Sequence, residues 1–312
     1  MRVLVTGGHG YIGGRLIQAL ARDRNFAVTA AGRSEAPQAA GVHAASVDWE
    51  SKGSIEQICR NQDAIVHLAA MNEADCERDP EGALRFNGFG TLNLLRTAEA
   101  AGVRRFIYLS TAKVFGANPA GTIDEVAAPR PTNHYGISHR VAEDYVLAEG
   151  GKGNIEGVVL RLSNAVGAPA RPGVNAWMLI ANDFCRQAVT TGRIVLRSSG
   201  MAWRNFTAMA DVVGALRHAL GMSKVSAADG LFHVGGPQSL RICDLAALIA
   251  KRAESVVGPV KIERPASAPG EHHPPLDWRS DKLAATGWAR RHNIEGEIDA
   301  TLDFCRVAFC PA

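Results

Sequence analysis

Long hydrophobic segments are the first thing that this 312-residue sequence lacks. No uninterrupted apolar run approaches the roughly 20 residues that a helix needs to cross a bilayer. The first residues offer no secretion signal either, because the apolar stretch at 3–5 breaks at a glycine-rich turn, short of the about 7–15 residues of a signal core. We therefore expect a cytoplasmic protein without a membrane partner.

Paired cysteines and an excess of charge are missing as well. The six cysteines are widely spread and form no CxxC pair, so we expect reduced thiols and no metal site. The 34 basic and 31 acidic residues leave a net charge of only +3, with no run of like charges. Such a balance argues against a nucleic-acid partner.

The first half of the sequence contains a regular alternation of short apolar runs with amphipathic segments, which predicts βαβ units and a parallel sheet. The apolar runs are nearly continuous, as in strands that are covered on both faces. Between the first two runs, Ile12, Leu16 and Leu20 recur at the spacing of one helix face. The expected strands are residues 3–5, 27–31, 42–47, 64–68, 106–109 and 158–162.

After residue 164 the pattern changes. Residues 168–173 are rich in Pro and Gly and predict a loop, and a helix is expected over about 176–190. Residues 259–275 hold five prolines, which favours a surface loop or a substrate lid. Residues 232–236 are typical of a returning strand. The expected division is a sheet domain of residues 1–164 with about 206–236, and a smaller lobe of residues 165–205 and 237–312.

A glycine-rich turn follows the first expected strand at once and opens the first helix. Gly7, Gly10 and Gly13 form a GxxGxxG spacing, which a dinucleotide site needs because the backbone must approach the pyrophosphate closely. The amides at the helix start, Tyr11 and Ile12, then face the phosphates together with the positive end of the helix dipole. Together with the alternating pattern, the motif predicts an α/β fold with a Rossmann doubly wound parallel sheet that binds NAD or NADP. The change of pattern after residue 164 adds the expectation of a smaller C-terminal substrate-binding lobe.

The end of the second expected strand bears on the choice between the two cofactors. A carboxylate there selects the ribose hydroxyl of NAD, whereas arginine accommodates the 2′-phosphate of NADP. This chain has Arg33 and Ser34 and no acid, so NADP is favoured over NAD. The alternative is an ordinary surface arginine at a strand end. Asp48, after the third strand, is a candidate ligand of the adenine amino group or a plain loop residue.

Several short motifs recur in an order and spacing that are specific only when taken together. They lie at residues 67–70, 87, 90–95, 109–116, 135–138 and 160–164. With the glycine turn, they make the sequence resemble the extended short-chain dehydrogenase/reductase family of NAD(P)-dependent nucleotide-sugar epimerases, dehydratases and ketoreductases. The resemblance implies a nucleotide-sugar substrate, a homodimer, and a cofactor that lies along Leu68, Ala69 and Ala70.

The same resemblance implies a catalytic set. Thr111, or Ser110 beside it, would hydrogen-bond the reacting sugar oxygen, and Tyr135 would exchange a proton with that oxygen as acid and base. The family lowers the pKa of this tyrosine with a lysine four residues later on the same helix face. Here that position is His139, which also stands where the family holds the nicotinamide ribose.

Three interpretations of His139 remain open at this point. In the first, the imidazole is protonated by the charge of the cofactor and does part of the work of the missing lysine. In the second, another cation takes the place of that lysine. In the third, the site is catalytically weak. Lys113 is the candidate substitute, because on a strand it would share a face with Thr111. The family's 4,6-dehydratases carry Asp-Glu at positions 112 and 113, and this chain has Ala112-Lys113, which disfavours 4,6-dehydration and favours ketoreduction.

The substrate lobe adds two candidate ligands. By resemblance, Asn164 and Arg204 contact the diphosphate of a sugar nucleotide, with Asn205 at a position where the family commonly has aspartate. A second phosphate-binding arginine has two candidates, Arg264 and Arg279. The sequence thus predicts a nucleotide-sugar epimerase or 4-ketoreductase. The alternatives are a catalytically silent sugar-nucleotide or NADP-binding protein, and an enzyme of the same family with a non-nucleotide substrate.

Overall fold

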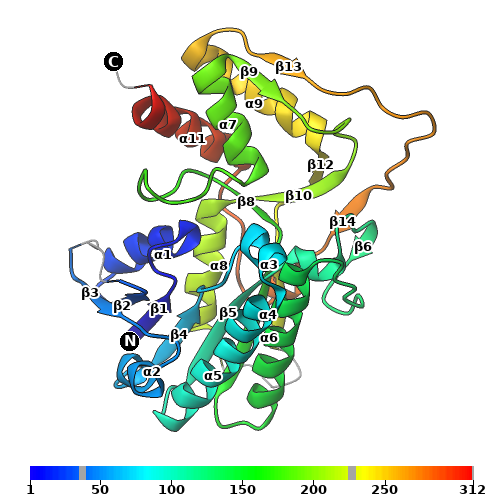
Figure 1. Ribbon diagram of the computed structural model, residues 1–312. Coiled ribbons are helices and arrows are strands. Elements are labelled where there is room, and N and C mark those ends of the chain that lie inside the picture. The colour runs from blue at the N-terminus through cyan, green and yellow to red at the C-terminus, as the bar shows by residue number, and fades with distance from the viewer. Residues whose placement is uncertain (35–39, 224–229, 311–312) are drawn as a thin grey trace.

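A seven-stranded parallel sheet forms the centre of the molecule, with its strands in the order β11-β7-β5-β4-β1-β2-β3 (Figure 1). The computed structural model describes residues 1–34, 40–223 and 230–310. The strands are β1 (Arg2–Thr6), β2 (Ala27–Gly32), β3 (Val42–Ser46), β4 (Ala64–His67), β5 (Arg105–Thr111), β7 (Glu156–Leu162) and β11 (Leu231–Val234). The six strands expected in the first half are therefore confirmed, as is the returning strand near residue 232.

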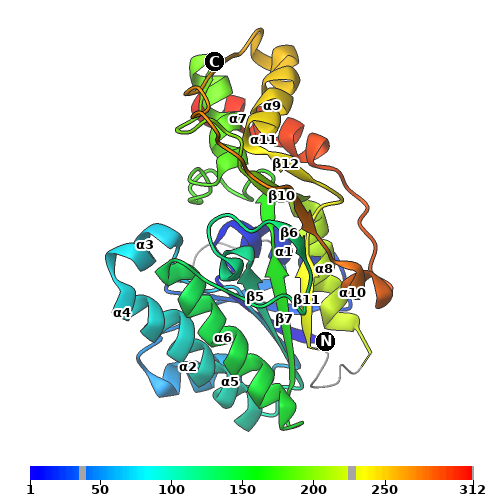
Figure 2. The same cartoon turned by 90° about the vertical axis from the view of Figure 1, so that its right-hand side faces the viewer.

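Helices cover both faces of this sheet because its strands are apolar on both sides. On one face, Leu4 and Phe106 pack with α2 (Lys52–Cys59), α5 (Thr91–Ala100) and α6 (His134–Gly151). On the other, Val3 and Val5 pack with α1 (Tyr11–Ala21) and α8 (Met209–Gly221) (Figure 2). The result is the doubly wound α/β architecture that the glycine turn and the apolar runs predict.

Strand order reverses between β1 and β4, since β1 lies beside both β2 and β4. Ligands of open α/β sheets bind at the carboxyl ends of the strands next to such a reversal. The turns that follow β1, β4 and β5 all lie at this edge, because the three strands are parallel. Sheet topology alone therefore assembles the motif residues of three distant segments at one place.

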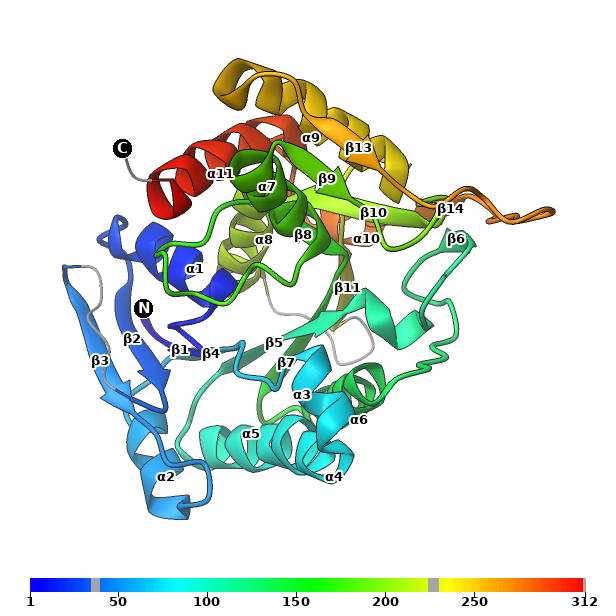
Figure 3. The same ribbon diagram turned by 45° about the horizontal axis from the view of Figure 1, so that its top comes forward.

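A smaller group of elements stands over that edge and has a core of its own (Figures 1 and 3). A three-stranded sheet, β12-β10-β8, and a two-stranded sheet, β13-β9, pack with three helices there. Their bounds are β8 (Asn164–Val166), β9 (Arg193–Val195), β10 (Trp203–Ala208), β12 (Ser239–Arg241), β13 (Lys261–Glu263), α7 (Ile180–Thr191), α9 (Ile242–Val257) and α11 (Ile294–Phe309).

The remaining described elements are short. They are α3 (Glu73–Arg78), α4 (Pro80–Ala83), the π-helix η1 (Leu84–Gly90), the 3₁₀ turn η2 (Ala112–Phe115), β6 (Gly121–Ile123), β14 (Leu276–Trp278) and α10 (Asp281–Ala285). Among the described helices, none is long and apolar enough to cross a membrane.

Two expectations for the second half need correction. The helix predicted from about residue 176 begins at Ile180, because the chain turns at 177–179 and Leu179 adopts the extended backbone of an N-cap. The proline-rich stretch 259–275 is not wholly a loop, because β13 pairs with β9 in parallel within it. Strand β13 is only three residues long, and its pairing partner lies far away in the sequence, so its local pattern gave no signal.

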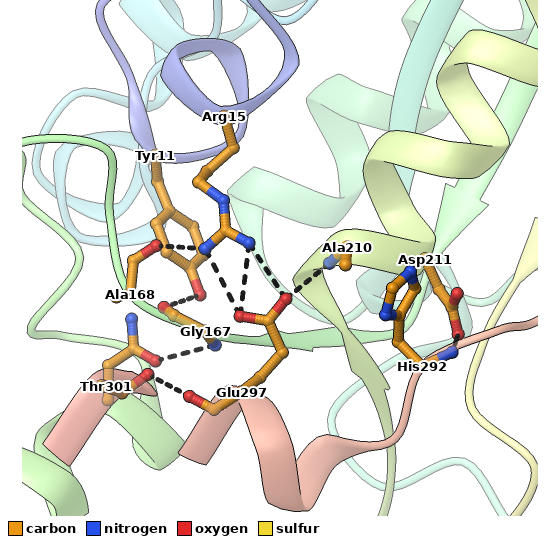
Figure 4. A network of polar contacts seen from close by, with 10 residues as sticks. Tyr11, Arg15, Gly167, Ala168, Ala210, Asp211, His292, Glu297 and Thr301 are labelled. Carbon is orange, nitrogen blue, oxygen red and sulfur yellow. Dashed lines mark hydrogen bonds and ion pairs between the residues drawn. The ribbon is translucent and has the colours of Figure 1, made fainter. Parts of the chain in front are cut away.

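Polar contacts from α1 fasten the two parts of the molecule together (Figure 4). The hydroxyl of Tyr11 donates a hydrogen bond to the carbonyl of Gly167 at 2.8 Å. One turn later, Arg15 donates to the carbonyl of Ala168 at 2.8 Å and forms an ion pair with the nearly buried Glu297 at 3.0 Å. Since Tyr11 directly follows the glycine turn, these contacts fix the start of α1 relative to the smaller group of elements.

The inner face of α6 carries a charged pair that is wholly buried. Glu143 and Arg161 of β7 are each 1% exposed or less and meet through two hydrogen bonds, of 3.0 and 2.9 Å. The guanidinium also lies 5.0 Å from the ring centroid of Phe115. An ion pair in this setting ties the helix to the sheet at one register.

Replacing Glu143 with Ala should destabilise the protein by about 3–5 kcal/mol, because the Arg161 charge would stay buried without its partner. Urea unfolding monitored by circular dichroism measures the loss. The matched control is Glu56→Ala on α2, whose exposed pair with Lys52 spans 3.8 Å and should contribute less than about 1 kcal/mol. Similar losses in the two variants would contradict the role given to the buried pair.

Candidate active site

The glycine turn after β1 has a backbone that leaves no room for side chains. Gly7 has φ +66°, and a Cβ on it would lie 2.8 Å from the amide nitrogen of Ala69. A Cβ on Gly13 would lie 2.2 Å from the carbonyl oxygen of Gly7. The turn is thereby pressed against the start of α1 and the end of β4, which is the packing that a dinucleotide cradle requires.

Helix α1 presents its N-terminus at this turn. Gly10 is the N-cap, and Tyr11 and Ile12 are the first helical residues, whose amides have no carbonyl of their own helix to bond. Such amides attract the oxygens of a pyrophosphate. The side chain of Tyr11 is engaged elsewhere, with Gly167, so only its backbone is free to serve the cradle.

The loop after β4 is fixed beside the glycine turn by Thr6. Its hydroxyl oxygen accepts hydrogen bonds from the amides of Leu68 and Ala69, at 3.2 and 3.3 Å. Ala70, the next residue, is exposed. The motif at 67–70 thus lies against the glycine turn.

The segment after β2 offers one available cation. Arg33 and Ser34 are exposed, and Arg33 makes no ion pair with any residue that the structure describes. The carbonyl of Ser34 accepts a hydrogen bond from His9 Nε2 at 2.9 Å, so this segment touches the glycine turn. Asp48 is exposed, and its carboxylate accepts from the amide of Glu50 at 3.0 Å, as in an ordinary turn.

Thr111 and Tyr135 come together at the same edge of the sheet. Thr111 ends β5, and Tyr135 lies in the first turn of α6, whose N-cap Asn133 accepts from the amide of Gly136 at 2.8 Å. Burial raises the pKa of Tyr135 above its ordinary value, and the nearby Thr111 hydroxyl offsets only part of that rise. Ser110 is buried, and its hydroxyl has no hydrogen-bond partner among the described residues.

His139 lies directly behind Tyr135, and the two ring centroids are 4.3 Å apart. Its side chain is buried, and Nδ1 is 2.6 Å from the hydroxyl of Tyr108. Burial lowers the pKa of His139 to about 3. The imidazole is therefore neutral at pH 7 and supplies none of the charge that a lysine would bring to Tyr135.

Lys113 lies in the turn η2 and not on a strand, so the expectation that it shares a strand face with Thr111 is wrong. The chain leaves β5 at Thr111 and enters the turn η2, yet both side chains line one pocket. The ammonium of Lys113 is 3.2 Å from Glu73 Oε1, which also accepts a hydrogen bond from the side-chain Nδ2 of Asn133 at 2.7 Å. Its charge is thus held by a carboxylate.

Glu73 and Asn133 were missed by the sequence reasoning. Asn133 had a recognisable signal, because asparagine is a preferred N-cap and stands just before the expected helix of Tyr135. Glu73 had none, since an acidic residue at the start of a short helix is ordinary. Only the packing of α3 against α6 brings it to the site.

The pocket next to Thr111 extends towards the substrate lobe. Its lining includes Lys113, Ser163, Asn164 and Arg204. Asn164 donates to the carbonyl of Asn205 at 2.9 Å, and Arg204 donates to Asn118 Oδ1 at 3.0 Å. The structure therefore brings both predicted substrate ligands to the side of Thr111.

The other candidate arginines lie elsewhere. Neither Arg264 nor Arg279 is among the described residues that line this pocket. Arg264 donates to the carbonyl of Ser199, and Arg279 pairs with Asp277 at 2.7 Å. Within the described residues, no group of three His, Cys, Asp or Glu side chains is arranged to hold a metal ion.

An internal brace explains two more motif positions. The amide nitrogen of Asn87 donates to Ser138 Oγ at 3.0 Å, and Ser138 donates to the carbonyl of Tyr135 at 3.0 Å. Asn87 Oδ1 in turn accepts from the amide of Met71 at 2.8 Å. The π-helix that contains Asn87 thus links the loop after β4 to the first turn of α6, and so fixes Tyr135 relative to that loop.

Curated relatives match either about half of the chain or nearly all of it. A UDP-glucose 4-epimerase of Azospirillum brasilense is 35% identical over 174 residues, which is 54% of this chain and 50% of the relative. The chain thus spans about half the length of that relative. A dTDP-D-glucose 4,6-dehydratase of Mus musculus is 24% identical over 326 residues, covering 99% of this chain and 89% of the relative.

Solved structures match over almost the whole chain. The UDP-glucose 4-epimerase of Thermotoga maritima, solved with UDP-glucose, has a TM-score of 0.82 at 22% identity and covers 98% of this chain and 99% of its own. The UDP-glucose 4-epimerase of Thermus thermophilus with NAD has 0.81 at 25% identity, and RMD of Pseudomonas aeruginosa with NADPH has 0.78 at 25%. For both, coverage is 98% of this chain and 99% of the other.

The model of the NAD dependent epimerase/dehydratase family matches residues 3–235, which include β1, the glycine turn, Thr111, Tyr135 and the returning strand β11. This confirms the resemblance noted from the sequence motifs. The chain belongs to the NAD dependent epimerase/dehydratase family.

Proposed function

We propose that this protein is an NAD(P)-dependent enzyme that acts at C4 of the sugar of a nucleotide sugar, as an epimerase or a 4-ketoreductase. One observation carries the proposal: Thr111, at the carboxyl end of β5, lies within hydrogen-bonding reach of the Tyr135 hydroxyl and also lines a pocket that contains Asn164 and Arg204. Assembly into a homodimer, inferred from family membership, belongs to the same proposal.

The residues at the cradle fit a nicotinamide dinucleotide. The closely packed Gly7 and Gly13 and the open amides of α1 suit a pyrophosphate, and the exposed Arg33 suits a 2′-phosphate, which favours NADP over NAD. Proteins of similar structure have been solved with NAD and with NADPH. When bound, the nicotinamide supplies the hydride acceptor or donor.

The protein's own part in the reaction is to hold the sugar oxygen and move one proton. Thr111 donates a hydrogen bond to the oxygen on C4, and the Tyr135 hydroxyl gives a proton to that oxygen during reduction or takes one from it during oxidation. Burial raises the pKa of Tyr135, so the phenol keeps its proton at neutral pH. That state is ready for reduction, whereas oxidation must first remove the proton.

The substrate lobe supplies recognition of the nucleotide part. Arg204 has a planar fork of donors, and it lines the same pocket as Asn164 and Thr111. Bidentate pairing with phosphate is the usual task of such an arginine. The carboxylate pair of a 4,6-dehydratase is absent from positions 112 and 113, and Lys113 supports ketoreduction in its place.

A second candidate function rests on His139. The imidazole of His139 is neutral and the ammonium of Lys113 is paired with Glu73 at 3.2 Å, so neither residue offers Tyr135 an unpaired cation. A catalytically silent protein that binds a sugar nucleotide or NADP would tolerate this arrangement. Turnover measurements with a catalytic variant separate the two functions.

Tyr135→Phe should lower turnover of the accepted nucleotide sugar by about 10²–10⁴-fold, because the proton carrier is lost, while cofactor affinity stays nearly unchanged. Product analysis with UDP-, GDP-, CDP- and dTDP-hexoses and their 4-keto forms measures the effect and separates epimerisation from reduction. The control is Tyr145→Phe on the same helix, whose ring packs near Phe89. Full activity in Tyr135→Phe would refute the catalytic assignment, and failure of every sugar nucleotide to bind would refute the substrate class.

His139→Lys should lower the apparent pKa of Tyr135 by about 1–3 units through the added cation. Below that pKa, the ionised fraction and the rate of sugar oxidation rise about tenfold per pH unit, so a lower pKa moves the rising limb to lower pH and increases activity near pH 7. The pH–rate profiles of the two proteins test this. If Lys113 already supplies the charge, the substitution will add little and Lys113→Met will be the damaging change instead.

NADP should bind more tightly than NAD, because Arg33 is available and no carboxylate selects the ribose hydroxyl. Arg33→Ala should weaken NADP binding roughly 10–100-fold, the scale of a charged hydrogen bond, and leave NAD binding nearly unchanged. Titration calorimetry gives both dissociation constants. Arg306→Ala, at the exposed end of α11, is the control. Tighter binding of NAD by the unmodified protein would show the preference to be wrong.

A further inference from the structure

Tyr108 and His139 form a buried contact on the inner face of α6, one layer behind the proposed acid and base. Tyr108 lies on β5 and is 2% exposed, and His139 is 3% exposed. The phenol oxygen and imidazole Nδ1 are 2.6 Å apart, and the two rings lie nearly parallel at 5.7 Å. Nothing in the proposed proton transfer uses Tyr108 directly.

The direction of this hydrogen bond follows from the surroundings of the phenol. Within the described chain, Nδ1 of His139 is the one hydrogen-bond partner found for the Tyr108 hydroxyl. Burial raises the pKa of Tyr108 well above its ordinary value, so the phenol keeps its proton. A buried O–H group needs an acceptor. The hydroxyl therefore donates, and Nδ1 accepts.

The neighbouring His67 does not compete for this proton. Its ring is 5.8 Å from that of Tyr108, but both of its nitrogens have other partners. Nδ1 lies 2.7 Å from Thr6 Oγ1, and Nε2 lies 3.0 Å from Thr91 Oγ1. The Tyr108 hydroxyl is thus left to His139.

The tautomer of His139 is then determined. A neutral imidazole has one nitrogen that donates and one that accepts. Since Nδ1 accepts from Tyr108, the proton lies on Nε2, across the ring. Nε2 is fully buried and has no hydrogen-bond partner among the described residues, and the ring packs on Tyr135. A buried donor without an acceptor is costly, and an oxygen of a bound molecule beside the ring would satisfy it.

We propose that Tyr108 is a positioning residue, which fixes His139 as a neutral imidazole protonated on Nε2 and so presents a directed N–H donor to an oxygen of the bound nicotinamide nucleotide. The identity of the acceptor rests on the proposed function; the tautomer does not. Tyr108 acts only through His139, and it needs no charge to do so.

A histidine at position 139 separates two properties that a lysine there would combine, namely hydrogen-bond donation and positive charge. A lysine ammonium donates hydrogen bonds and also carries a positive charge. The Tyr108–His139 pair retains a donor but has no charge. Cofactor binding is thereby preserved, while the pKa of Tyr135 stays raised by burial.

Nitrogen NMR of the full-length protein tests the tautomer without any ligand. Protein labelled with ¹⁵N in its histidine rings is recorded in a long-range ¹H–¹⁵N correlation, which distinguishes a protonated from an unprotonated ring nitrogen. His139→Gln identifies the signals of His139. The expected spectrum shows protonated Nε2 and unprotonated Nδ1. A proton on Nδ1 would overturn the proposal.

Tyr108→Phe then tests the positioning role. Without the donor, the ring should lose its single tautomer, and the dissociation constant of NADP should rise about 3–10-fold, the scale of one hydrogen bond. Tyr145→Phe is the matched control and should change neither property. A Tyr108→Phe protein with the Nε2–H tautomer and unchanged affinity would refute the role.

Two further outcomes have a defined meaning. If Tyr108→Phe does not fold, the spectrum of the unmodified protein still tests the tautomer: a proton on Nε2 supports the proposal and a proton on Nδ1 overturns it. If the unmodified protein binds neither NADP nor NAD, the proposed function fails, and the role of Tyr108 as a positioning residue for cofactor binding fails with it. In that case an Nε2–H tautomer would report the protonation of His139 and would say nothing about cofactor binding.

Discussion

The polar inner face of α6 is the constraint on which the site depends. Most helices that cover this sheet do so with apolar side chains, but α6 places His139 and Glu143 against it. Buried polar groups must find partners, and these are Tyr108 on β5 and Arg161 on β7. Because the partners sit on two adjacent strands, the helix has one permitted register, and that register sets the position of Tyr135.

Much of the fold could be predicted from the sequence because its signals are local. Continuous apolar runs gave the six strands of the first half, and the glycine spacing gave the cradle, since steric limits at Gly7 and Gly13 act over a few residues. The start of α7 and the strand β13 were not predictable in this way. The first depends on one turn, and the second on pairing with the distant β9.

The electrostatics of the site could not be predicted from the sequence, because they also depend on contacts between distant residues. Motif spacing identified Tyr135 and the departure at His139, but it did not give the burial that makes the imidazole neutral. It also did not reveal that Glu73 holds Lys113, because the two residues are 40 positions apart. The Arg15–Glu297 pair that joins the two parts of the molecule spans 282 positions. The pairing of such charged residues follows from the packing of the folded chain and cannot be inferred from their positions in the sequence.

Neutrality at His139 bears on the direction of the proposed reaction. A buried neutral imidazole cannot lower the pKa of the adjacent phenol as a lysine would, and the ammonium of Lys113 is paired with Glu73. Tyr135 therefore rests in its protonated form, which is the form that delivers a proton to the oxygen of a ketone as it becomes an alcohol. Epimerisation needs the same group to accept a proton as readily as it gives one. The raised pKa of Tyr135 therefore fits the reductive half of the proposed chemistry, as does the NADP preference proposed from Arg33.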